Sequence, residues 1–397
     1  MAIDAGAGQA RGRPALLRRL AEWWGPRPFT QVAVLLAVLA LFYALGANTA
    51  ATMARVGITP GFDFLHRAAN FEIGESLVPF RAGDTYLRAI GVGLLNTARV
   101  AVLGCLLATV IGVAVGVARL SGNLLLSGMA RWYVEIARNT PLLLQLFFWI
   151  ALAHSFPVPR QATALFGAVF LTNRGVFVPA LVLDGVTLPA GLLAAAIVVA
   201  WVIALWHLLR HTTLTLRLTL LTTLLAIAAL GTLAVATGAH LSVELPALSG
   251  FNIRGGYSLT PEFAALLVGL TVKFSASIAE VVRAGILSVR AGQWEAARAL
   301  GLHDGQIMRL VVLPQALRVI TPLTTSNYLD LVKDSSLAVA IGYPDLVSVV
   351  NTTANTTGQA FEALLILIAV YLTLNLSISA LMNRYNRRVA LRGEQPA

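Results

Sequence analysis

The sequence predicts an all-α integral membrane protein, and three observations support this fold class. The chain has 397 residues, of which 57% are hydrophobic and only 12% are charged, whereas about a quarter of the residues of a soluble domain carry a charge. The mean hydropathy is +0.78. Apolar segments long enough to cross a bilayer as helices recur along the chain, and arginines gather in several of the connections between them.

The first apolar segment, 29–47, follows a polar region, 1–28. A secretory signal peptide is the competing interpretation, but the polar region is too long for one and the apolar run is long enough to span. We therefore expect a first helix that stays in the mature protein, with the amino terminus inside. The mixed polar region 48–87 contains no span and is expected to form an external loop. The polar region carries these arginines and interfacial tryptophans: Arg11, Arg13, Arg18, Arg19, Trp23 and Trp24.

Seven further spans are expected after this loop. The second contains Gly104, Gly112 and Gly116, which would let another helix approach closely. Segments 154–188 and 239–259 are expected to be external, and 335–350 to be a partial membrane segment. The expected spans are 88–118, 130–153, 189–209, 218–238, 261–287, 311–332 and 361–382.

Counting eight spans places both termini on the same side of the membrane. The arginine-rich connections then all fall on that side as well, at 119–131, 210–217, 283–309 and 384–392. Basic residues accumulate in cytoplasmic loops, so both termini are expected to be cytoplasmic. This rule also explains the formal net charge of +11 without nucleic acid as a partner.

The third span is interrupted by Asn139, Thr140 and Pro141, directly after Arg138. Proline removes a backbone donor and clashes with the preceding turn, so the helix is expected to break or kink there. We interpret these four residues as a gating or packing element rather than a substrate contact.

Several ionisable residues fall at membrane depth, where charges are costly and usually face a cavity or a partner. Lys273 and Glu280 are seven residues apart, hence on roughly one helix face, with Arg283 close by. A zwitterionic substrate needs a cation for its carboxylate and a carboxylate for its ammonium. The alternative is structural ion pairing, which we favour for Asp330, Lys333 and Asp334, although Asp330 stays a candidate for the substrate pathway. For Glu280 we favour substrate contact.

The segment 292–314 is a polar interruption in this apolar chain. It contains good helix formers from Gly292 to Leu300, then Gly301, which predicts a helix, a turn and a second helix. Asp304 is expected to cap the second helix, beginning near Gln306. An ordinary connector is the alternative interpretation, since the triplet Glu-Ala-Ala is common by itself.

Several activities lack the residues that they need. The two lysines are Lys273 and Lys333, and neither follows a glycine, so the chain has no P-loop sequence for binding ATP phosphates. Cys105 is the single cysteine, and the six histidines are scattered. His207 and His211 have helical spacing, but no acidic or thiol ligand lies near them in sequence. We expect no metal site, no cofactor and no catalytic residue.

The spacing of the polar segment resembles a known motif. Glu295-Ala296-Ala297, three residues, Gly301, nine residues, then Val311-x-Leu313-Pro314 resembles the coupling motif of ATP-binding-cassette (ABC) importer permeases, with Val311 replacing the usual isoleucine. The flanking sequences resemble the polar amino-acid uptake family, and the extra length resembles the larger, eight-span subunit of general L-amino-acid permeases. The flanking sequences are GLLNTARVAV (93–102), YVEIARNTPLLLQLFF (133–148), AEVVRAGILSVRAGQWEAARALGL (279–302) and LPQALRVITPLTTSNYLDLVKDSSLAVAIG (313–342).

This resemblance implies a type I ABC importer permease fold in the bacterial inner membrane. It implies that Glu295, Ala296, Ala297 and Gly301 insert into a groove of a cytoplasmic ATPase dimer, with Leu313 and Pro314 completing the motif. Its other expected partners are a second permease, a periplasmic amino-acid-binding protein and an L-amino acid of broad or polar and acidic range. The implied organisation is a permease domain, 88–383, with a periplasmic insertion at 154–188, extra spans at 189–238, a coupling loop at 288–314 and a cytoplasmic tail at 384–397.

One alternative from another class is a self-sufficient secondary transporter of small polar solutes. It would predict an internal repeat, and a membrane enzyme would predict a cluster of His, Glu and Asp; the sequence shows neither. An exporter or sensor subunit would leave the segment 292–314 without a purpose. The sequence therefore favours a transport subunit that is not itself an enzyme.

Overall fold

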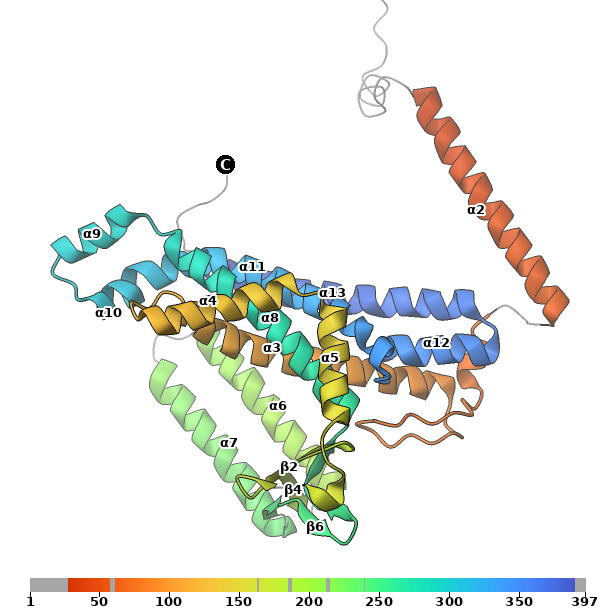
Figure 1. Ribbon diagram of the computed structural model, residues 1–397, viewed down its shortest axis with the longest axis horizontal. Helices are drawn as coiled ribbons and strands as arrows, with labels where there is room; N and C mark the ends of the chain where they lie inside the picture. Colours follow the sequence, from red (N-terminus) through yellow and green to blue (C-terminus); the bar gives the residue numbers. More distant parts are fainter. Residues whose placement is uncertain are drawn as a thin grey trace, which may run out of the picture.

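A computed structural model describes residues 28–57, 61–162, 164–184, 188–211, 215–238 and 240–389. The expected cytoplasmic segment 1–28, apart from its last residue, lies outside the described residues, and so does the tail from residue 390 onward. A mainly helical body runs from α9 (Ala291–Ala299) at one end to the loop 61–85 at the other. Helix α2 (Pro28–Val56) stands apart from it (Figure 1).

Within the described ranges, six helical segments are long and apolar enough to cross a membrane, and a seventh is added if the bent pair of α4 (Leu124–Asn139) and α5 (Leu142–His154) is one span. Helix α6 (Leu188–His211) adds a shorter apolar helix, Ala196–Leu205, so the expected number of eight is not confirmed within the described residues. The six belong to α2, α3 (Tyr86–Ala118), α7 (Thr215–Thr237), α8 (Pro261–Leu287), α11 (Leu313–Asp334) and α13 (Ala360–Val389).

Two glycines bring α3 and α8 into close contact, as their small size predicted. A Cβ atom added to Gly112 would lie 2.8 Å from the Cβ of Ile278, and one added to Gly116 would lie 2.8 Å from the carbonyl oxygen of Ala279. Any larger residue would push the two helices apart. Helices in lipid associate largely through such close packing, because lipid tails are as apolar as the side chains.

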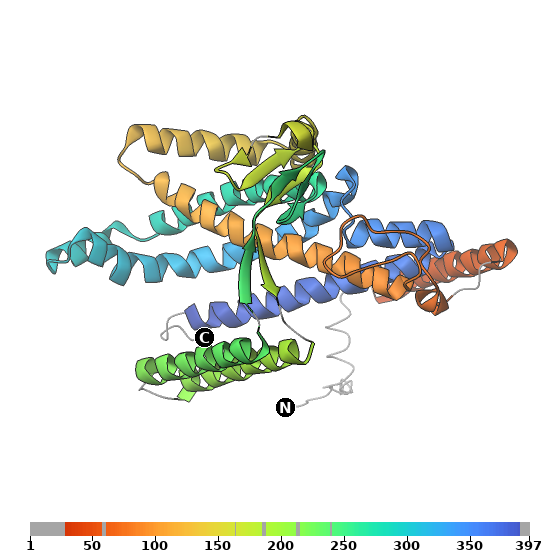
Figure 2. The same ribbon diagram turned by 90° about the horizontal axis from the view of Figure 1, so that it is seen from below.

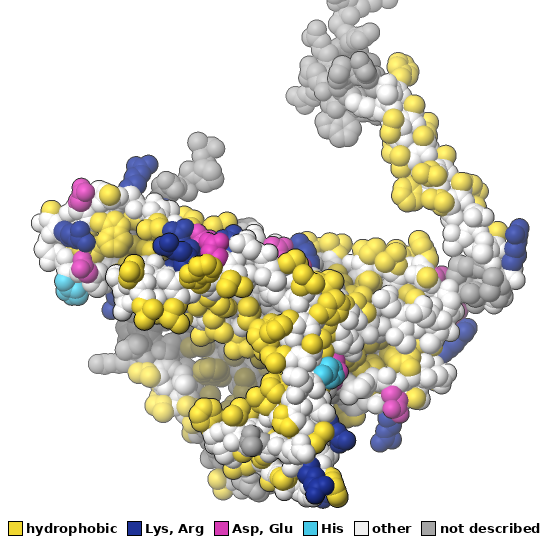
Figure 3. Space-filling model, in the orientation of Figure 1, with side chains coloured by type: hydrophobic (Ala, Val, Ile, Leu, Met, Phe, Trp, Pro, Cys, Tyr) yellow, Lys and Arg dark blue, Asp and Glu magenta, His cyan; other side chains and the backbone are white. Residues whose placement is uncertain are grey.

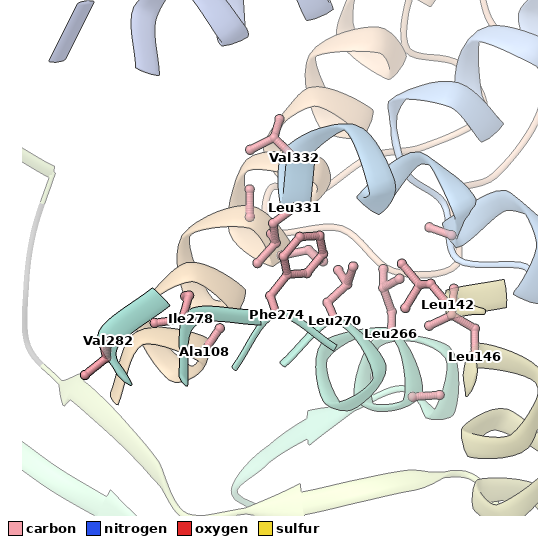
Figure 4. Close-up of a cluster of buried hydrophobic side chains, with 14 of the residues drawn as sticks. Ala108, Leu142, Leu146, Leu266, Leu270, Phe274, Ile278, Val282, Leu331 and Val332 are labelled. Atoms are coloured by element: carbon pink, nitrogen blue, oxygen red, sulfur yellow. The ribbon is translucent and has the colours of Figure 1, made fainter. Parts of the chain in front are cut away.

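The core is organised around one face of α8. Leu266, Leu270, Phe274, Ile278 and Val282 recur along this face, and all are buried. They form one cluster with Ala108 of α3, Leu142 and Leu146 of α5, and Leu331 and Val332 of α11, and Figure 4 shows Leu266, Leu270 and Phe274 in the middle of it. Helix α8 therefore holds the other elements in position.

Helix α4 (Leu124–Asn139) and helix α5 (Leu142–His154) meet at an angle of 105°. Thr140 is the C-cap of α4, and its extended backbone (φ −91°, ψ 129°) leads into Pro141, the N-cap of α5. Proline disfavours helical backbone in the residue before it. The break predicted at Asn139-Thr140-Pro141 is confirmed, and it is a sharp elbow.

Short strands follow α5 and precede α8, and the all-α expectation did not include them. They form a four-stranded sheet in the order β1-β2-β3-β8, in which Phe170 pairs with Phe177 and Val176 with Leu259, and two ribbons, β4-β5 and β6-β7. The alternation of apolar and polar residues was too short to predict them. The strands are β1 (Ala164–Leu165), β2 (Val169–Thr172), β3 (Gly175–Val178), β4 (Ala180–Asp184), β5 (His240–Glu244), β6 (Ala247–Ser249), β7 (Asn252–Arg254) and β8 (Tyr257–Leu259).

The ribbon β4-β5 carries the helical hairpin α6-α7. Ala180 pairs with Glu244 and Asp184 with His240, so the chain leaves and re-enters the sheet region at adjacent points. Figure 2 shows the hairpin, in yellow-green, lying beside the main body and joined to it through these two strands. The hairpin is therefore an insertion into a helical body formed by the flanking segments.

The remaining elements close the end of the body opposite α9. Buried Phe64 lies in the short helix η1 (Asp63–His66) and packs with Tyr86 of α3 and Leu346 of α12 (Leu346–Thr357). The expected partial membrane segment 335–350 consists of the 3-10 helix η4 (Ser335–Ile341) and the start of α12. Gly342, at φ +82°, separates them in a left-handed conformation that glycine adopts readily.

Candidate functional site

The polar segment forms a projection made of α9, α10 (Asp304–Ile307) and the π-helical turn η3 (Met308–Val312). Charged side chains gather over this end of the molecule, whereas the helical body behind it is mostly uncharged (Figure 3). Glu295 and Ala296 are exposed, but Ala297 is only 3% exposed and belongs to the core cluster. Ala297 therefore anchors the projection from within, and Glu295 and Ala296 lie on its outer surface.

Gly301 ends α9 in a left-handed conformation, at φ +76°. The following amide, Leu302 N, donates to the carbonyl oxygen of Ala297 at 3.2 Å, which closes the helix end. A Cβ atom added to Gly301 would meet no atom within 4 Å. Glycine is thus required here for its backbone conformation, and the space beside it is open.

The second helix begins earlier than predicted, and its cap is a different residue. His303, rather than Asp304, is the N-cap: its Nδ1 accepts a hydrogen bond from Gln306 N, and Gln306 Oε1 accepts one from His303 N. Asp304 instead lies 3.5 Å from Arg298 of α9. The expectation about Asp304 was wrong because histidine is seldom considered as a cap, although its ring nitrogen can accept a hydrogen bond.

The end of the motif, Leu313-Pro314, begins α11 directly after the π-helical turn. Proline cannot donate a backbone hydrogen bond, so it fits the first turn of a helix but interrupts the regular bonding before it. Gln315 Nε2 donates to Val311 O at 3.0 Å and to Gln293 Oε1 of α9 at 3.3 Å. Sequence analysis missed Gln293 and Gln315, because only the folded chain places them side by side.

A groove of about 370 Å³ lies where α8 passes into the projection. Its lining includes Ile286 and Leu287 at the end of α8, and Trp294, Glu295 and Arg298 from α9. An apolar floor with a carboxylate and a guanidinium at its edge is a surface that a protein partner can engage through both packing and charge.

The predicted membrane charges divide in the structure between an ion-paired triad around Glu280 and a second region, in which Asp334 lies near Lys273, Asp330 and Lys333. Glu280 forms ion pairs with Arg119, the C-cap residue of α3, and with Arg283, whose Nη2 lies 2.5 Å from Glu280 Oε1. The Arg119 side chain is 10% exposed and that of Glu280 is 25% exposed. This triad joins α3 to α8. Such structural ion pairing is the alternative to substrate contact that the sequence left open for these charges.

Lys273 lies at the elbow between α4 and α5. Its Nζ donates to the carbonyl oxygens of Arg138, at 2.9 Å, and Thr140, at 3.4 Å. Two sets of residues predicted separately, the lysine and the Arg138–Pro141 break, are therefore brought together. A cation at a helix C-terminus is favourable because the helix dipole places partial negative charge there.

Asp330 and Lys333 form an ion pair near the end of α11, next to Asp334. Lys333 Nζ lies 3.7 Å from Asp330 Oδ1, and both side chains are about 60% exposed. An exposed pair of this kind contributes little to stability.

Comparison with known proteins agrees with this architecture. Residues 108–391 match the family described as "Binding-protein-dependent transport system inner membrane component". The chain is 45% identical to the "Putative amino-acid ABC transporter permease protein YhdX" of Escherichia coli, over 91% of this chain and 93% of that protein. It is 42% identical to the "General L-amino acid transport system permease protein AapQ" of Rhizobium johnstonii, over 91% of this chain and 92% of that protein.

A third relative is the "Glutamate/glutamine/aspartate/asparagine transport system permease protein BztB" of Rhodobacter capsulatus, with 38% identity over 91% of this chain and 93% of that protein. The crystal structure of "an amino acid ABC transporter with histidines" is 22% identical, covers 76% of this chain and 95% of that chain, and has a TM-score of 0.46. With a family match over most of its length, the chain belongs to the binding-protein-dependent inner-membrane components, as a multi-pass amino-acid ABC importer permease of the type I fold.

Proposed function

We propose that this permease supplies half of a pathway for L-amino acids and is driven by a separate ATPase docked on the projection α9–α10. The observation that carries this proposal is the projection itself. Glu295 and Ala296 are exposed on it, the space beside Gly301 is open, and an apolar groove lies next to them. The chain has no P-loop sequence, so another polypeptide has to bind the ATP.

The projection is built to transmit force. The His303–Gln306 capping box fixes the start of α10, and the Gln293–Gln315 hydrogen bond joins α9 to the start of α11. The Arg298–Asp304 pair lies between α9 and α10 but is exposed and adds little. Ala297 fixes it to the core. Closure of an ATPase dimer would therefore move α8 and α11 together with the projection. If the ATPase binds the projection more tightly in one conformation of the permease than in the other, its closure shifts the equilibrium toward that conformation.

The membrane charges divide into a substrate role and a structural role. Lys273 is the proposed partner of a substrate carboxylate, with Asp330 available to a substrate ammonium and with Arg138, Asn139, Thr140 and Pro141 forming the elbow beside it. Glu280 and Arg283 were also candidates for the substrate pathway. We assign them instead a structural role, in which they hold α8 against α3 through Arg119. Two arginines already neutralise the Glu280 carboxylate, which leaves less of its charge for a substrate.

The remaining partners follow from the family and the relatives. One chain with a single projection supplies one docking site, and an ATPase dimer has two, so a second permease is proposed. A periplasmic binding protein would deliver the substrate. One relative is named for general L-amino acids and another for glutamate, glutamine, aspartate and asparagine, so we propose a broad range of L-amino acids. No cofactor or metal is proposed.

Co-purification in mild detergent tests this function. The affinity-tagged permease should bring down an ATPase and a second permease in a stable complex that takes up L-amino acids in vesicles with ATP inside. Amino-acid uptake by the permease alone, without an ATPase, would refute the proposal and support a self-sufficient transporter.

A further inference from the structure

Asp345 is a buried carboxylate that neither the coupling mechanism nor the proposed substrate pathway uses. It lies between the candidate spans Asp304–Ile341 and Ala360–Asn386, directly before α12, and is only 1% exposed. Its Oδ1 caps α12 by accepting a hydrogen bond from Ser348 N at 2.8 Å. Its Oδ2 is also buried, and it accepts no hydrogen bond from the described part of the chain. One carboxylate oxygen is therefore satisfied and the other is not.

A second polar atom without a partner faces the same space. The hydroxyl of Tyr371 on α13 is buried and makes no hydrogen bond within the described ranges. It lies close to Asp345, to Thr97 of α3 and to Ser335 of η4. Helices α12 and α13 pack side by side here (Figure 1). The cluster thus collects polar side chains from four elements in the interior of the body.

The cluster is short of hydrogen-bond donors. Thr97 Oγ1 donates to Gly93 O at 3.0 Å, and Ser335 Oγ donates to Val332 O at 2.7 Å. A hydroxyl group has a single proton to donate, so neither of these side chains can donate to the Asp345 carboxylate as well. A proton on Oδ2 would turn this oxygen from an acceptor without a partner into a donor that faces hydroxyl oxygens.

Among the residues that the structure describes, no cation forms an ion pair with Asp345. The charged groups at this end of the body have other partners. Arg99 Nη1 lies 2.6 Å from Glu75 Oε1, and Glu362 Oε1 accepts a hydrogen bond from Gly61 N at 3.1 Å. Nothing in this neighbourhood therefore compensates an ionised Asp345 by charge.

Burial is the main influence on the Asp345 carboxyl. The other titratable groups that face it are the phenols of Tyr343 and Tyr371, which carry no charge at neutral pH. Burial raises the pKa of Asp345 to about 7, although the backbone hydrogen bonds of the helix cap act in the opposite direction. The carboxyl group therefore binds and releases a proton near neutral pH.

We propose that Asp345 is a proton-binding site that controls how firmly η4 and α12 are held against α3 and α13. The proton binds Oδ2, which then donates toward the Tyr371 hydroxyl, while Oδ1 keeps the cap of α12. Loss of the proton leaves a buried charge with one unsatisfied oxygen and loosens this joint. Pro344 and Ser348, close to Asp345 in the chain, line a cleft of about 460 Å³, so the site makes one wall of that cleft sensitive to pH. This inference goes beyond the proposed function and does not depend on it.

Thermal unfolding at several pH values tests the site. Asp345→Asn resembles the protonated side chain, because its oxygen can keep the cap and its amide is a permanent donor. The folded protein holds the proton at a pH where the unfolded chain has released it. Wild type therefore loses stability as the pH rises from about 4 to about 7, and Asp345→Asn does not. The matched control is Asp63→Asn, since Asp63 is an exposed aspartate.

The full-length permease is purified in detergent, and its unfolding temperature is measured from about pH 5 to about pH 8. We expect the advantage of Asp345→Asn over wild type to grow by about 3 °C or more across this range, and Asp63→Asn to follow wild type. Titrations that all three proteins share cancel in these differences. Parallel profiles for wild type and Asp345→Asn would overturn the site.

A sodium titration at the upper end of the pH range separates a proton from a metal cation. Stability that rises with sodium concentration in wild type, but not in Asp345→Asn, would overturn the proposal, because a cation would then hold the carboxylate. Stability that responds to sodium equally in both proteins is the result expected for a proton site.

Infrared spectroscopy keeps the proposal testable if Asp345→Asn does not fold. Tyr371→Phe retains the carboxyl group and removes only the hydroxyl that faces it. Over the same pH range, wild type should show a carboxylic-acid C=O band that disappears as the pH rises, and Tyr371→Phe should shift this band because its hydrogen-bond partner is lost. Identical difference spectra for the two proteins would contradict the pairing of Asp345 with Tyr371.

Discussion

The ammonium group of Lys273 on α8 lies 2.9 Å from the backbone carbonyl oxygen of Arg138 at the end of α4. This contact joins a charge at membrane depth to the helix break at 139–141, which lies inside the segment 130–153 expected to cross the membrane. It explains how an ionised lysine is stable there, because the carbonyl groups released by the elbow are the acceptors that it needs.

Replacing Lys273 by methionine should destabilise the elbow. The Arg138 carbonyl would lose its charged donor, and hydrogen bonds to charged groups contribute roughly 1.5–3 kcal/mol. We expect a lower thermal unfolding temperature of the purified permease complex in detergent, together with weaker amino-acid uptake. Lys333→Met is the matched control, since Lys333 is the other lysine of the chain and its ion pair is exposed. Equal destabilisation by both substitutions would contradict the assigned contact.

The Glu280→Gln variant distinguishes the structural role of Glu280 from substrate contact. Removing the carboxylate leaves Arg119, whose side chain is 10% exposed, and Arg283 without their acid partner. Since Glu280 itself is partly exposed, we expect a loss of about 1–3 kcal/mol in stability, with every substrate affected alike in uptake. Asp330→Asn, in an exposed pair, should cost well under about 1 kcal/mol. A change in KM for one class of amino acid alone would return Glu280 to the substrate pathway.

Gly116→Ala should separate α3 from α8. The added methyl group would lie 2.8 Å from the Ala279 carbonyl oxygen, and overpacking of this kind costs roughly 1–3 kcal/mol. Gly128→Ala on α4 is the control, because a Cβ atom there meets nothing within 4 Å and alanine favours helix by about 1 kcal/mol. Thermal unfolding in detergent should show opposite shifts, and a stabilised Gly116→Ala variant would refute the close packing.

Gly301→Ala should weaken coupling while leaving the membrane body intact. Alanine at φ +76° is strained by about 1–2 kcal/mol, so the turn between α9 and α10 would shift. We expect assembled permease with less transport for each ATP hydrolysed. Gly292→Ala, equally free of contacts but within α9, should transport normally. Unchanged coupling in Gly301→Ala would show that the turn conformation is not used.

The main helices could be predicted from the sequence because apolar length and arginine placement are local signals. Helix α8 runs from Pro261 to Leu287, the segment expected from hydropathy, and the elbow followed from Pro141. The short strands could not be predicted, since β2 and β3 have four residues each and become stable only by pairing with each other and with β8.

The projection was predicted in outline and corrected in detail. Its position, helices and glycine turn follow from local sequence, but the His303 cap and the Gln293–Gln315 hydrogen bond depend on distances that only folding creates. The same limit applies to charges. Sequence spacing suggested that Lys273 and Glu280 act together, whereas the structure joins Lys273 to α4 and Glu280 to Arg119 of α3.

Site-specific crosslinking tests the docking of the projection most directly. Cys105 is the single cysteine, so Cys105→Ser gives a background into which Glu295→Cys is introduced, with Glu72→Cys in the loop at the other end of the body as the matched control (Figure 1). In the assembled complex, a short thiol-to-amine crosslinker should join position 295 to the ATPase, in a yield that changes with ATP, and should not join position 72. Crosslinking of position 72 to the ATPase, or none at position 295 in an active complex, would contradict the account.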